Sequence, residues 1–237
     1  MYEHIFKNHN LKPINQFPIF NDGYTAVWPS VLILFCFSIF IYLRVVTPYK
    51  LAMTFRSSYN LQAIRQLERE EFNPLNPTSY ALTILFLLMF SFYLFKLNAQ
   101  LNLVLTDVQP VLQYIFFIVI TTVFNGLKYI LKQLVTVISD SQQLGTELFY
   151  SNLVINQAMG LILLPALIVV EFSGITSPYL LISIGAVLFF GFIIKVYRGF
   201  IFSLFENHIG LLQVFIYLCA LEILPFLVFT KFIITSF

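Results

Sequence analysis

Glu222 and Pro225 interrupt a run, from 209 to 230, that is otherwise almost wholly apolar. A carboxylate in the middle of a membrane-spanning helix costs about 2.5–3.5 kcal/mol on insertion scales. Pro225 has no amide hydrogen, so the carbonyl oxygen of Leu221 loses its donor within the helix. We therefore expect a protonated Glu222 to face other helices and to lock this segment against them, with Cys219 packing on the same face.

A second group of polar and small residues lies near the start of an earlier apolar run. Asn152, Asn156 and Gly160 follow one another at helical spacing, Gln157 lies beside them, and Pro165 comes further along the run. Such residues favour close packing and hydrogen bonds between membrane helices. Structural contact between helices is one interpretation. A proton or ion path is the other, although no chain of such groups can be traced.

The sequence contains no motif that predicts a catalytic, metal or cofactor site. It has no Gly-rich phosphate loop, no Cys-x-x-Cys pair and no His-Glu-x-x-His helix. The formal net charge is +2, without a basic cluster, so nucleic acid is not an expected partner. We expect neither catalytic residues nor a cofactor.

Composition places the chain in a membrane. Of its 237 residues, 59% are hydrophobic and only 10% are charged, whereas a soluble domain has about a quarter charged residues. Apolar runs of about 20 residues match the hydrocarbon thickness of a bilayer, and there each run must be helical to satisfy its backbone. The sequence predicts an all-α, polytopic helix bundle with about six spans, near residues 27–45, 80–97, 110–127, 153–170, 178–197 and 209–234.

The distribution of basic residues predicts the orientation of these spans. Nine of the 13 Lys and Arg residues fall in the first, third and fifth connections, and four fall on the other side. The side richer in positive charge is normally cytoplasmic. We therefore expect residues 1–26 to be a periplasmic tail, residues 27–237 to be one membrane domain of a bacterial inner membrane, and both termini to be periplasmic. The nine residues are Arg44, Lys50, Arg56, Arg65, Arg69, Lys128, Lys132, Lys195 and Arg198.

The first connection, residues 46–79, is expected to be a cytoplasmic loop. A helix capped by Ser57-Ser58 would carry Arg65, Glu68 and Arg69 on its outer face. That face is either a solvated surface or a docking surface for a partner protein.

Residues 126–140 form a predicted amphipathic helix. Its polar side carries Lys128 and Lys132, which suit anionic lipid headgroups. The segment would lie along the cytoplasmic interface or extend the third span. It is interpreted as a membrane-surface connector, with a substrate gate as the alternative.

The closing stretch LCALEILP, residues 218–225, resembles the C-terminal signature of a family of polytopic inner-membrane proteins of Bacteroidota that is catalogued as a domain of unknown function. Asn156, Gln157, Gly160 and Pro165 are also similar to that family. The resemblance covers roughly residues 147–237. It implies an envelope protein and transfers no catalytic residues.

Two functions are therefore compared. The first is a non-enzymatic subunit that contacts lipids and other inner-membrane subunits of a larger machine for protein export or envelope biogenesis. The second is a proton-coupled transporter or lipid-handling protein that uses Glu222. The first is preferred because the chain has no soluble domain, no catalytic motif and no internal repeat.

Overall fold

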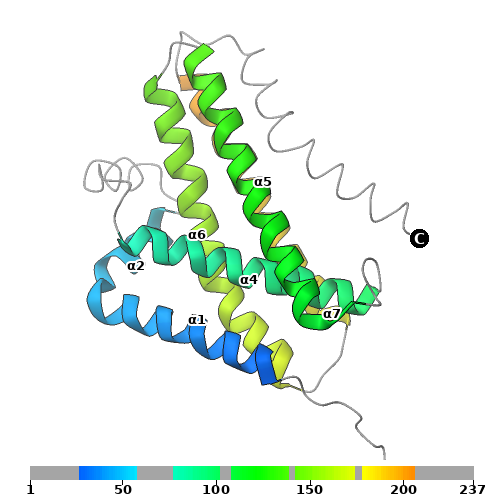
Figure 1. Ribbon diagram of the computed structural model, residues 1–237. Coiled ribbons are helices and arrows are strands. Elements are labelled where there is room, and N and C mark those ends of the chain that lie inside the picture. Colours follow the sequence, from blue (N-terminus) through cyan, green and yellow to red (C-terminus); the bar gives the residue numbers. More distant parts are fainter. Residues whose placement is uncertain (1–26, 58–76, 102–107, 139–141, 174–177, 206–237) are drawn as a thin grey trace, which may run out of the picture.

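The computed structural model describes residues 27–57, 77–101, 108–138, 142–173 and 178–205. Within these ranges every regular element is an α-helix, which confirms the predicted all-α class (Figure 1). The helices are α1 (Val27–Val46), α2 (Pro48–Ser57), α4 (Pro77–Leu101), α5 (Pro110–Ile138), α6 (Gln142–Phe172) and α7 (Pro178–Phe205).

Proline marks the start of four of these helices. Pro48, Pro77, Pro110 and Pro178 are the first residues of α2, α4, α5 and α7. Proline suits the first helical position, because its fixed backbone angle fits the helix and the amide hydrogen that it lacks would have no partner there. Pro165 instead lies inside α6, which continues through it.

Five of the described helices are long and apolar enough to cross a membrane: α1, α4, α5, α6 and α7. The chain is therefore a polytopic membrane protein. The helices differ in how much of their apolar stretch is buried inside the bundle. The share is 50% in α6 and 44% in α4, but only 22% in α1, 22% in α5 and 17% in α7.

Helix α6 occupies the centre of the bundle and contacts every other described helix. It packs most extensively on α4, which it crosses (Figure 1). The core around this pair contains Met89 and Phe92 from α4, Leu167 from α6 and Cys36 from α1. Cys36 is a fully buried free thiol and packs in this core.

Several helices differ from the expected ranges. Helix α5 continues without a break from Pro110 to Ile138, so the predicted amphipathic segment extends the third span, which was one of the two expected arrangements. Helices α6 and α7 also exceed their expected ranges, α6 mainly at its start and α7 at its end. Helix α2 occupies the first part of a connection for which only a later helix was expected. Ser57 is the last residue of α2, and the rest of the predicted cap and its helix lie outside the described residues.

Some expectations lie outside the described residues. These are the N-terminal tail, the sixth span with Cys219, Glu222 and Pro225, and the part of the first connection with Arg65, Glu68 and Arg69.

Candidate functional site: a polar layer at one end of the bundle

Polar side chains gather where α1 ends and α4 begins. They come from α2, α4, α6 and α7, and most of them are buried or half-buried. We call this group the polar layer. Its members are Lys50, Ser57, Thr78, Ser79, Thr83, Ser151, Asn156, Gln157, Lys195 and Arg198.

Gln157 joins α6 to the first turns of α4. Its side chain is only 3% exposed. The amide nitrogen lies 2.8 Å from the hydroxyl of Ser79, 3.1 Å from the carbonyl oxygen of the same residue and 3.2 Å from the hydroxyl of Thr83. A buried amide surrounded by three oxygens replaces the water that it would otherwise bind. Gln157 therefore fixes the position of α6 along α4.

Arg198 joins three helices. From α7 its guanidinium donates to the carbonyl oxygen of Ser57, at the end of α2, over 2.8 Å. A second nitrogen lies 3.4 Å from the hydroxyl of Ser151 in α6. The carbonyl groups of the last helical turn have no partners within their own helix, and they carry partial negative charge. Arg198 therefore caps the end of α2.

Two lysines in the polar layer also reach across helices. Lys195 of α7 donates to the side-chain oxygen of Asn156 in α6. Lys50 of α2 lies 3.3 Å from the hydroxyl of Thr78 in α4. In both of these contacts the acceptor is a neutral oxygen atom.

The predicted strip of Asn152, Asn156 and Gly160 does not face a single neighbour. Asn156 contacts α7, whereas Gly160 lies against α4, where an added Cβ would come 2.7 Å from the Cα of Phe86. Asn152 is half-buried, and Pro165 is exposed. Lys128 lies over the ring of Phe124, 4.9 Å from its centre, and the side chain of Lys132 is outside the described set.

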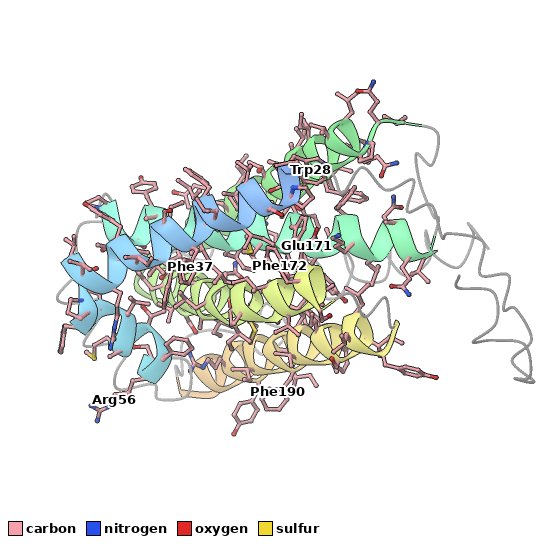
Figure 2. The ribbon with its side chains drawn as sticks, turned by 90° about the horizontal axis from the view of Figure 1, so that it is seen from below. Trp28, Phe37, Arg56, Glu171, Phe172 and Phe190 are labelled. Carbon is pink, nitrogen blue, oxygen red and sulfur yellow. The ribbon has the colours of Figure 1, made fainter. Side chains whose placement is uncertain are left out.

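The opposite end of the bundle holds an ion pair between α4 and α6. The side-chain nitrogen of Lys96 lies 2.5 Å from a carboxylate oxygen of Glu171. Lys96 also lies 5.4 Å from the centre of the Phe92 ring. Figure 2 shows Glu171 and Trp28 at the end of the bundle away from Arg56.

An aromatic cluster lies beside this ion pair, because Phe92, which Lys96 approaches, belongs to it. Trp28 contacts the rings of Phe92, Phe95 and Tyr114, with centres 6.1, 5.2 and 5.3 Å apart. Aromatic side chains are enriched where membrane helices meet the headgroup region. The cluster therefore suits a membrane interface.

Sequence reasoning missed the pairing of Lys96 with Glu171 and the roles of Arg198 and Ser57. The sequence contained one signal for Arg198, since a basic residue at the end of an apolar helix needs an acceptor. Its acceptor is 141 residues away in the chain, so the partner could not be read from spacing.

The polar contacts between the described residues join helices to one another. Among the described residues, no three His, Cys, Asp or Glu side chains come close enough to hold a metal ion. The polar layer carries hydrogen-bond donors and positively charged side chains. The ion pair can hold α4 and α6 together at the other end.

The chain belongs to the family described as domain of unknown function (DUF4271), which matches residues 30–233. The match extends beyond the C-terminal region that carried the resemblance, back to the first span. No curated protein and no solved structure matches the chain.

Proposed function

We propose that this member of the DUF4271 family is a non-enzymatic subunit of a larger complex in the inner membrane of Bacteroidota, acting in protein export or envelope biogenesis. Its role is to bind other membrane proteins through the outer faces of its helices. The resemblance of LCALEILP supports the bacterial group, and the distribution of basic residues supports periplasmic termini.

The observation that carries this proposal is the open outer face of α5. This helix buries only 22% of its apolar stretch in the bundle. Thr122 and Gly126 lie on the exposed face, one turn apart, and no atom of the described residues lies within 4 Å of a Cβ added to Gly126. Small residues at this spacing let another helix approach closely, whereas contact with lipid does not require them. The face therefore suits a helix as its neighbour.

Substitution of Gly126 tests the proposal. Gly126→Leu adds bulk on a face that is empty within the described bundle, and it replaces a poor helix former by a good one. The chain itself should therefore fold normally. Overpacking of a helix interface costs about 1–3 kcal/mol, so recovery of a partner that binds there should fall by about tenfold or more.

The measurement is mass spectrometry of proteins that co-purify with the tagged chain from its native host in mild detergent. Val123→Leu is the matched control, because Val123 is exposed on the same helix and contributes no small residue. Equal partner recovery with Gly126→Leu and with the unsubstituted chain would count against the α5 face. Purification of the unsubstituted chain without any stoichiometric partner would overturn the subunit proposal itself.

A substitution at Glu222 distinguishes the subunit proposal from the alternative of a transporter. Glu222→Gln keeps a donor and an acceptor of the same shape, so a structural Glu222 tolerates it. A transporter that releases a proton from Glu222 would assemble normally after this change and lose its activity. A stable Glu222→Gln chain that fails to complement a deletion strain would favour the transporter.

A further inference from the structure

Arg198 is a buried cation whose two hydrogen-bond acceptors are both neutral groups. Its side chain is 4% exposed, and it lies next to the last residue of the apolar stretch Tyr179–Gly199. No described carboxylate pairs with it, and Glu171 pairs with Lys96 at the other end of the bundle. A buried charge is normally paired, because its desolvation costs several kcal/mol. The end of α2 supplies only part of the missing negative charge.

Ser57 adds a second unsatisfied group at the same place. Its carbonyl oxygen accepts from Arg198, but its side-chain hydroxyl is fully buried and has no hydrogen-bond partner. A buried donor without an acceptor is destabilising. The Arg198 guanidinium therefore has no negatively charged hydrogen-bond acceptor among the described residues, and the Ser57 hydroxyl has no acceptor at all.

We propose that Arg198, Ser57 and Ser151 form a binding site for a phosphate group, supplied by the headgroup of an anionic lipid. The planar guanidinium presents pairs of N–H groups that match two phosphate oxygens. The contact of Arg198 with Ser151 is long, at 3.4 Å, so a phosphate oxygen can take its place while the 2.8 Å bond to α2 remains.

The depth of the site favours a lipid as the source. Arg198 is one residue from the end of its apolar stretch, and Ser151 is one residue from the start of Tyr150–Phe172. Both therefore lie near the level of the headgroups. Arg44 and Arg56 are exposed at the same end and attract anionic lipid to it.

The test compares the melting temperature of the full chain in uncharged detergent with and without added phosphatidylglycerol. Diacylglycerol with the same acyl chains lacks the phosphate, and inorganic phosphate at matched ionic strength lacks the lipid. We expect phosphatidylglycerol to raise the melting temperature by several degrees and diacylglycerol to have no effect. A rise with inorganic phosphate as large as that with phosphatidylglycerol would keep the phosphate site but make the free ion its ligand.

Three variants assign the effect to the site. Arg198→Gln should abolish the rise caused by phosphatidylglycerol, whereas Arg56→Gln, an exposed arginine on α2, should retain it. Ser57→Ala should melt at or above the temperature of the unsubstituted chain without lipid, because it removes an unsatisfied donor, and it should gain less from phosphatidylglycerol. If Arg198→Gln does not accumulate, Ser57→Ala decides. A full rise in Arg198→Gln or Ser57→Ala, or an equal rise with diacylglycerol, would overturn the proposal.

Discussion

At the scale of single residues, buried polar side chains fix how the helices of this chain meet. Apolar surfaces in lipid can slide past one another at little cost, because the lipid tails are as apolar as the side chains. Gln157 removes this freedom, since its three oxygen neighbours all belong to the first turns of α4. A shift of one helical turn would separate them.

Gln157→Leu is expected to destabilise the bundle. The change replaces the amide by an apolar side chain of similar size and leaves the hydroxyl groups of Ser79 and Thr83 without this donor. The loss should be about 1–2 kcal/mol, because hydrogen bonds between membrane helices contribute modestly. Thermal unfolding in detergent measures it. Ser183→Ala is the control, since Ser183 is exposed and bonds only within its own helix. Equal melting temperatures for the two variants would show that Gln157 does not stabilise the bundle in this way.

At the scale of elements, the crossing of α4 and α6 determines the arrangement of the others. Gly160 allows the two backbones to approach, because even a Cβ at this position would come 2.7 Å from the Cα of Phe86. A Cβ does not come this close to a carbon atom to which it is not bonded, and backbone cannot move aside as a flexible side chain can. The crossing point therefore requires glycine.

Alanine substitution at two glycines should give opposite results. Gly160→Ala forces α4 and α6 apart and should lower stability by about 1–3 kcal/mol. Gly126→Ala meets nothing within 4 Å and should be neutral or slightly stabilising, because alanine is the better helix former. Thermal unfolding of the two purified variants makes the comparison. A neutral Gly160→Ala would contradict the close crossing.

At the scale of the whole molecule, the five described spans begin and end on opposite sides of the membrane. The polar layer lies at the end where the chain leaves α7, and the ion pair of Lys96 with Glu171 lies at the end where it enters α1. A sixth span would return the C-terminus to the side of the N-terminus.

Cysteine labelling tests this topology. In a chain without Cys36 and Cys219, single cysteines near residue 10 and near residue 60 should react from opposite sides of the membrane. Cysteines near residues 10 and 237 should react from the same side. An impermeant maleimide applied to intact and permeabilised cells makes the measurement. Labelling of positions 10 and 60 from one side would refute the orientation.

The class and most of the spans could be predicted because lipid imposes a simple rule, in which each crossing needs about 20 apolar residues in a helix. Helix α2 escaped prediction because it has only ten residues, and it buries Leu51 and Met53 against helices distant in sequence. The partners of Glu171 and Arg198 could not be predicted either. The types of these two residues are visible in the sequence, but the oxygen or nitrogen atoms that they meet depend on the crossing of helices.

The length of α5 and α6 has a consequence for the exchange of amide hydrogens with deuterated water. At 1.5 Å per residue, these helices of 29 and 31 residues extend about 43 and 46 Å, beyond the roughly 30 Å of a hydrocarbon core. Their ends at residues 138 and 142 extend past α2 and α4 (Figure 1). In a bilayer disc, residues 110–130 should exchange slowly and residues 131–138 quickly, although they form one helix. Slow exchange throughout in native membranes, but not in the disc with the isolated chain, would mean that another protein covers the projecting turns.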